Sequence, residues 1–141
     1  MPALTTYRDT PRLGGEHRMT HPVKAGAICY QGALVGLQGG YLVPATAATG
    51  LLIMGRCEET VDNSTGVDGA VTCDVLTDYA FRWDNSTTVG DIVTQANVGQ
   101  LCYALNDHTV GVQSSGRSAA GRVYKVDSDG VWVMSGLEYL Q

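Results

Sequence analysis

The sequence predicts an all-β protein, a small barrel or sandwich of short strands with an extended N-terminal arm and at most one short helix. Its apolar runs are short, and glycine or other turn residues separate them at close to the ~8–12-residue spacing of such folds. Among its 141 residues, 18 are glycine, well above the usual ~7%. A chain of this length suits one domain with a single core. We therefore expect many tight turns and no second domain.

The first 22 residues differ from the rest and are predicted to be an extended arm. They show no sustained hydrophobic period, contain three of the four prolines and include a Gly-Gly break. The charge is also divided unevenly. Residues 1–24 hold four Lys/Arg and two Asp/Glu, a net +2, whereas residues 25–141 hold five and twelve, a net −7. An acidic body argues against nucleic-acid binding, which needs a concentrated basic face.

The β domain is predicted to run over residues 23–136, followed by a tail at residues 137–141. Its clearest strand is Ala70 to Val75, where apolar and polar residues alternate, so one face should be buried. Aromatic residues recur at every second position in the stretch YAFRW, which should place Tyr79, Phe81 and Trp83 along one side of a strand. Such a row is more typical of a core or a subunit interface than of a ligand platform.

The stretch Gly121 to Gly136 predicts a β-hairpin with its turn at Asp127 to Gly130. β-Branched and aromatic residues flank an Asp-Gly pair, a strong hairpin signal. An EF-hand calcium loop does not fit this stretch, whether Asp127 is taken as position 1 of the loop or Gly130 as position 6. It needs oxygen ligands at positions 1, 3 and 5, glycine at 6 and glutamate at 12. We expect no metal here.

Two further segments carry local signals. The stretch TVGDIVTQANVGQ is the only helical candidate, with Thr94 as a possible N-cap and Gly99 as a stop, enough for one or two turns. The tetrapeptide Asp-Asn-Ser-Thr occurs twice, at residues 62–65 and 84–87. Asp and Asn side chains hydrogen-bond the local backbone, so each copy predicts a turn between strands.

No motif of an enzyme, a metal site or a cofactor site stands out. The four cysteines lack the Cys-x-x-Cys spacing of structural zinc sites, and each sits beside apolar residues, as buried thiols do. His17 and His21 stand four apart, but Arg18 occupies the place of the metalloprotease glutamate. There is no Gly-x-Ser-x-Gly elbow and no phosphate-binding loop. We expect no catalysis, no cofactor, no export signal and no membrane span, with synthesis in a reducing cytoplasm.

As an ordered combination, several segments resemble the bacteriophage head decoration proteins, also called capsid cement proteins. They are VKAGAICYQGALVGL, GYLVPATAATGLLIMGRCEETVDNSTG, GQLCYALNDHTVGV and SAAGRVYKVDSDGVWV, and the likeness spans roughly Val23 to Val133. The resemblance implies an all-β structural protein on the outer surface of an icosahedral virion, bound to the major capsid protein. It also implies a homotrimer, with a dimer as the alternative. Arm and tail lie outside the likeness.

The arm supplies the candidate contact residues, Arg8, Arg12 and Arg18. Their charges are available for a neighbouring subunit or the acidic face of a shell. The alternative function is a host- or carbohydrate-binding β-domain of a virion. That function requires Trp83 and Trp132 to face solvent and stack on sugars.

Overall fold

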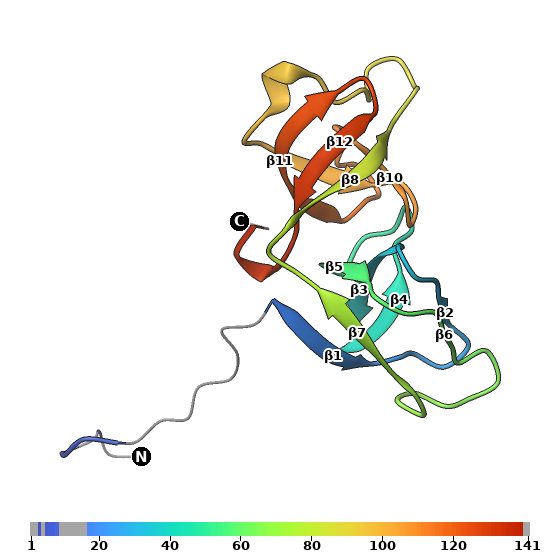
Figure 1. Cartoon of the computed structure of the whole chain (residues 1–141), viewed down its shortest axis with the longest axis vertical. Helices are drawn as coiled ribbons and strands as arrows, with labels where there is room; N and C mark the ends of the chain where they lie inside the picture. Colours follow the sequence, from blue (N-terminus) through green and yellow to red (C-terminus); the bar gives the residue numbers. More distant parts are fainter. Residues whose placement is uncertain (1–2, 4, 9–16, 140–141) are drawn as a thin grey trace.

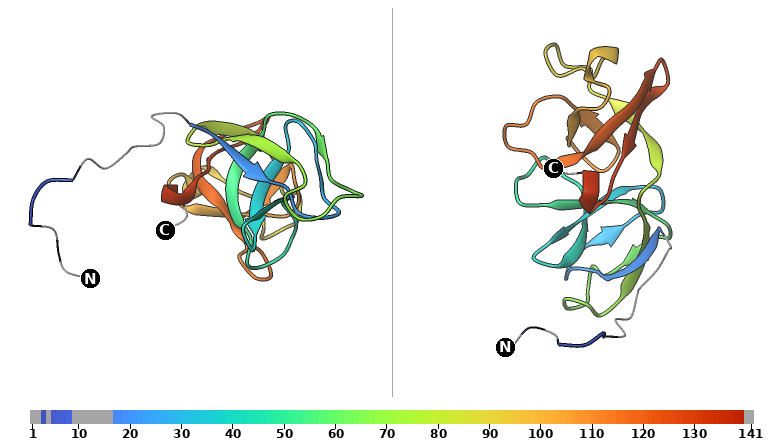
Figure 2. Two further views of the ribbon diagram at one scale, coloured as in Figure 1. Left: turned by 90° about the horizontal axis from the view of Figure 1, so that it is seen from below. Right: turned by 90° about the vertical axis from the view of Figure 1, so that its left-hand side faces the viewer.

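The computed structural model describes residue 3, residues 5–8 and residues 17–139. It confirms an all-β architecture that includes a small closed barrel. Strands of the N-terminal half form an open sheet at one end of the body, and strands of the C-terminal half form the barrel at the other (Figures 1 and 2). The described residues contain no α-helix, and their helical content is two single 3₁₀ turns, η1 (Gln95–Asn97) and η2 (Leu137–Tyr139).

The open sheet has five strands in the order β1-β7-β5-β3-β4. Strands β2 and β6 form a separate two-stranded sheet. The bounds are β1 Arg18–Pro22, β2 Ile28–Cys29, β3 Leu34–Gln38, β4 Tyr41–Pro44, β5 Leu52–Cys57, β6 Val61–Asp62 and β7 Thr72–Leu76.

One boundary differs from the sequence prediction. Residues 18–22, expected in the arm, form β1, which pairs antiparallel with β7 in the register Arg18↔Leu76 to Pro22↔Thr72. The reason is that the alternating polar and apolar side chains of this segment gain a partner strand more than fifty residues away. The tail differs too, because three of its residues form η2.

The barrel closes in the order β10-β8-β12-β11-β9. Closure depends on β10, which pairs parallel with β8 and antiparallel with β9. A closed sheet leaves no unpaired edge at which another strand could add. The bounds are β8 Ala80–Asn85, β9 Leu101–Ala104, β10 Thr109–Gly111, β11 Ala119–Asp127 and β12 Gly130–Met134.

Two apolar clusters fill the body, one in the barrel and one in the sheet. The barrel cluster includes Trp83, Val110, Val131 and Val133 together with Ile53 of β5, so the sheet contributes to the barrel core. The sheet cluster includes Val35, Leu42 and Val75 with three cysteines. In β7, Cys73 and Val75 are fully buried whereas Thr72 is exposed, which confirms the predicted alternation.

The predicted hairpin is formed by β11 and β12, with Asp127 opposite Gly130. One carboxylate oxygen of Asp127 accepts the backbone N–H groups of Asp129 at 2.8 Å and Gly130 at 3.1 Å. The other accepts the indole N–H of Trp132 at 3.0 Å. These bonds hold the pKa of Asp127 below its ordinary value, with the Trp132 bond as the largest cause. The carboxylate organises the turn, as the sequence predicts.

Of the two Asp-Asn-Ser-Thr copies, the first lies at a turn, as predicted, whereas Asp84 and Asn85 of the second belong to β8. Asn63 is buried and donates to the carbonyls of Val23, Lys24 and Val67. Asn85 bonds both backbone polar groups of Val93, at 2.9 Å to the N–H and 2.8 Å to the carbonyl. The helical candidate is a single turn that begins after Thr94, whose N–H is accepted by Asn97 at 2.8 Å.

Candidate functional site

An apolar groove of about 420 Å³ lies where the sheet meets the C-terminal turn. Leu52 and Met54 project into it from β5, while Ile53 between them points to the barrel core. β1 contributes its alternate residues Met19 and His21. The apolar side chains of the groove are Met19, Leu37, Leu52, Met54 and Leu137. Because Leu52 and Leu137 are 40% and 56% exposed, the groove leaves apolar surface open to solvent.

His21, which lines this groove, carries an unusual polar atom. Its Nε2 is buried and has no hydrogen-bond partner. Burial also lowers the pKa of His21, which favours the neutral ring near neutral pH. Buried polar atoms are normally paired, because an unpaired one loses its hydration without replacement. Since Nε2 has almost no accessible surface, a group in the groove would bond it, and remove this cost, once the imidazole turned toward the groove.

The rim of the groove is acidic, through Asp78 and Glu138. Asp78 has a positive φ of 65°, an uncommon conformation for a residue with a side chain. Its N–H donates to the carbonyl of Ser135 at 2.9 Å, and its carboxylate lies 3.3 Å from Nδ1 of His17. The backbone connecting β7 to β8 is thereby fixed against the segment after β12. Two carboxylates on an apolar groove suit a ligand with an apolar body and a cationic end.

The three arginines predicted as contact residues are placed differently from one another. Arg8 lies in the exposed segment at residues 5–8, and Arg12 lies outside the described residues. Arg18 belongs to β1 and lies 3.5 Å from the carboxylate of Asp74 on β7. Its side chain is still 54% exposed. Arg18 therefore has an ion-pair partner within its own sheet, although an exposed pair of this kind contributes only about 0–1 kcal/mol to stability.

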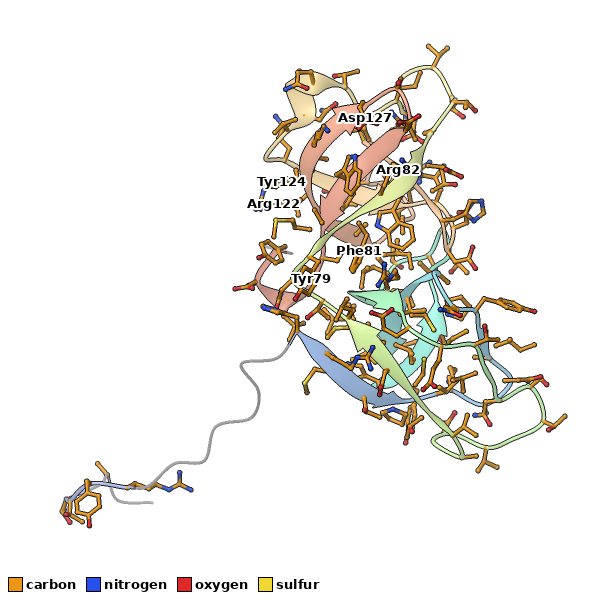
Figure 3. The ribbon with its side chains drawn as sticks, in the orientation of Figure 1. Tyr79, Phe81, Arg82, Arg122, Tyr124 and Asp127 are labelled. Carbon is orange, nitrogen blue, oxygen red and sulfur yellow. The ribbon has the colours of Figure 1, made fainter. Side chains whose placement is uncertain are left out.

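The aromatic row begins at Tyr79, just before β8, and continues along β8 into the barrel core. Trp83 is buried, Phe81 is half-buried and Tyr79 is 47% exposed. Ring centroids are 6.5 Å apart for Phe81 and Trp83 and 6.3 Å for Tyr79 and Phe81. Arg56 lies 4.2 Å over the Phe81 ring. Figure 3 shows Tyr79 at the junction between barrel and sheet, with Phe81 further along β8. The shared side predicted from the sequence is confirmed.

A second hollow, of about 580 Å³, brings together two stretches that the sequence singles out. It lies between residues 84–88, with the second Asp-Asn-Ser-Thr copy, and the hairpin turn at residues 127–130. Its lining is mostly hydroxyl, amide and carboxylate. Asp127 and Asn85 are already occupied by the bonds that hold their turns. Within the described part of the chain, no cluster of three or more His, Cys, Asp or Glu side chains suits a metal ion.

Asp91 forms a buried charge network that the sequence does not reveal. Its carboxylate accepts bonds from Arg117 at 2.8 Å, the Gln113 N–H at 2.9 Å and the Ser86 hydroxyl at 2.9 Å. The Arg117 bond is the largest cause that lowers the pKa of Asp91 to about 2. A Cβ at Gly111 would overlap this carboxylate, so glycine is required beside it. The network fixes the loop after β8 to the segment after β10.

The thiols are buried, and two of the three imidazoles, those of His17 and His108, lie beside carboxylates. All four cysteines are free and buried, as predicted, and Sγ of Cys57 and Cys73 are 3.2 Å apart. Burial raises the pKa of Cys29 and of Cys102 to about 12. His108 lies in an exposed turn, 2.9 Å from Asp107. None of the hydrogen bonds found among residues 17–139 joins an imidazole to a serine or cysteine side chain.

The groove could not be predicted from the sequence as long as β1 was assigned to an arm and η2 to a tail. A signal was present: in His17 to His21 the polar Arg18 and Thr20 alternate with the groove-facing Met19 and His21. Five residues with period two are a short strand. The acidic rim gave no signal, because Asp78 and Glu138 come from segments sixty residues apart.

Comparisons with models of known protein families, with curated proteins and with solved structures found no match to this chain. Among the helices of the described residues, none has the length and apolar character needed to cross a membrane.

Proposed function

We propose that this protein is a structural component of a bacteriophage virion that decorates and stabilises the outside of an icosahedral capsid. In this role it binds the major capsid protein, as a homotrimer or, alternatively, a dimer. The observation that carries the proposal is the ordered likeness from Val23 to Val133 to capsid decoration proteins. Its proposed location is the outer capsid surface, after synthesis in the host cytoplasm.

Surface composition supports a role in broad protein contacts. Tyr7, Tyr30 and Tyr124 are 91%, 57% and 63% exposed, and tyrosine is enriched at protein interfaces. The loop between β8 and β9 exposes Val89, Ile92 and Val98 at the barrel end of the body (Figure 1). Exposed apolar side chains at separate places suit a protein that contacts both a shell and its own copies.

The basic N-terminal segment is proposed to strengthen this binding through charge. A contribution of this kind weakens with salt, because ions screen exposed charges beyond about 8 Å at physiological ionic strength. Since β1 begins at Arg18, an arm deletion must stop before it. Removing residues 2–16 leaves β1 complete, whereas a longer deletion would take a strand from the sheet.

The test is cosedimentation of the purified protein with empty phage heads that lack decoration. We expect the full-length protein to bind, with affinity falling as salt rises. The variant lacking residues 2–16 should bind more weakly, with a smaller salt dependence and nearly unchanged thermal unfolding. No cosedimentation of the folded full-length protein with any tested head would refute the function. Equal binding by both proteins at every salt concentration would refute the role of the arm alone.

The alternative, a sugar-binding domain of a virion, has weaker support. Trp83 is only 5% exposed and lies in the barrel core. The Nε1 of Trp132 is bonded to Asp127, and Arg82 lies 5.9 Å from its ring. Red-shifted tryptophan emission that sugars quench would favour this alternative.

A further inference from the structure

The apolar groove between β1, β5 and η2 has the features of a docking site for a short peptide segment. It combines an open apolar floor, one buried unpaired nitrogen and two carboxylates at the rim. Its volume of about 420 Å³ lies within the range of sites that enclose small ligands. An occupant that fits all three features has an apolar body, a hydroxyl able to reach Nε2 and a positive charge beside it.

The same chain carries a segment with those three properties in sequence. Tyr7 supplies an aromatic ring that ends in a hydroxyl, and Arg8 follows it with a positive charge. The Tyr7 side chain is 91% exposed, and residues 5–8 lie away from the β body in Figures 1 and 2. A large aromatic residue in an exposed segment gains most of its binding energy by inserting into an apolar pocket.

We propose that the groove of one copy binds residues 5–8 of a second copy, with the Tyr7 ring over Met19, Leu52 and Met54. The imidazole of His21 turns so that Nε2 pairs with the Tyr7 hydroxyl, and Arg8 lies against Asp78 and Glu138. A phenol both donates and accepts, so it satisfies Nε2 in either tautomer of the neutral imidazole. The inference rests on the self-association included in the proposed function and is independent of binding to a shell.

The reach of the chain allows this exchange. Nine peptide steps separate Arg8 from His17, and an extended chain spans about 3.3–3.6 Å per residue, or roughly 30 Å in all. His17 itself lies at the groove rim, 3.3 Å from Asp78. Each copy therefore presents its own groove where its N-terminal segment departs, so reciprocal or cyclic exchange between copies is geometrically simple. A closed ring of such contacts would leave no groove empty.

The decisive experiment uses the full-length protein with a photo-crosslinking phenylalanine analogue at the exposed position 6, which keeps Tyr7 and its hydroxyl. Protein labelled with ¹⁵N is mixed with unlabelled protein before irradiation, and crosslinked peptides are identified by mass spectrometry. We expect mixed-isotope crosslinks from position 6 to the peptides that contain Met19 or Met54. Crosslinks within one isotope only would overturn exchange between copies in favour of the chain's own segment. Crosslinks that avoid the groove, or none at all, would overturn the docking site.

Matched variants test the same contact without a crosslinker. Leu52→Glu places a charge in the groove, and Val67→Glu introduces the same charge at an apolar residue that is 74% exposed in the loop between β6 and β7. We expect Leu52→Glu and Tyr7→Phe to weaken self-association by about tenfold or more, measured by light scattering against concentration. Val67→Glu should leave it unchanged, and melting curves establish that every variant is folded. Self-association of folded Leu52→Glu equal to that of the natural protein would refute the proposal, whatever its binding to phage heads.

Discussion

Replacing Asp91 by Asn is expected to destabilise the protein strongly, because it removes a buried charge from a fully bonded network. Asn has nearly the same shape, and its one acceptor oxygen can keep the bonds from Arg117 and Gln113. Its NH2 group then faces the Ser86 hydroxyl, which must turn to accept, and the negative charge is lost. The Arg117 side chain is only 16% exposed and would lose its counter-charge. Breaking a buried pair costs about 3–5 kcal/mol, and the partial exposure of Arg117 reduces this to about 2–4 kcal/mol.

The pH dependence gives an independent estimate of the same effect. The pKa of Asp91 is lowered from 3.8 to about 2 in the folded protein. A difference of this size corresponds to about 2 kcal/mol of stability. Because the folded pKa is the lower one, this stabilisation is present above pH 3.8 and is lost as the pH falls through 2. The Asp91→Asn variant has no carboxylate to protonate at this position, so residue 91 causes no loss of stability as the pH falls.

Urea unfolding followed by tryptophan fluorescence measures both effects, since Trp83 is buried in the barrel core. The free energy of unfolding of Asp91→Asn should lie about 2–4 kcal/mol below that of the natural protein at pH 7, with the gap narrowing by about 2 kcal/mol towards pH 2. Asp84→Asn, at an exposed position on β8, is the control and should change stability little. A gap below about 0.5 kcal/mol at pH 7, or one that stays constant with pH, would refute the reasoning.

Two further predictions concern the hairpin and the thiols. Gly130→Val should cost about 3 kcal/mol or more, because φ is 155° and a Cβ would lie 2.5 Å from the carbonyl oxygen of Trp83 on the neighbouring strand. Asp129→Asn, at a side chain that is 72% exposed, should cost less than about 0.5 kcal/mol, and equal melting temperatures for the two variants would contradict this account. All four thiols should react slowly with a chromogenic disulfide reagent in the folded protein, and four should react after denaturation. An intramolecular disulfide in freshly purified protein, detected by mass spectrometry, would contradict the expected reduced state.

Local sequence patterns determined the elements whose structure depends on near neighbours. The β11–β12 hairpin follows from an Asp-Gly pair between β-branched runs, because the turn and its strands lie within sixteen residues. The buried face of β7 follows from strict alternation, and the buried cysteines follow from their apolar neighbours. The turn after β6 follows from Asp62, which accepts the nearby N–H of Ser64, whereas Asn85 of the second Asp-Asn-Ser-Thr copy bonds Val93, eight residues away.

Only the tertiary structure decided which distant segments meet. β1 became a strand because β7 offers a partner edge, the barrel closed because β10 pairs parallel with β8, and Asp91 met Arg117 across 26 residues. The groove likewise joins β1, β5 and η2, whose residues carry no shared local pattern. Side-chain periodicity reports which face of a segment is buried, but it does not identify the surface that buries it. That choice depends on chain closure and on packing of the whole body, which no short window of sequence contains.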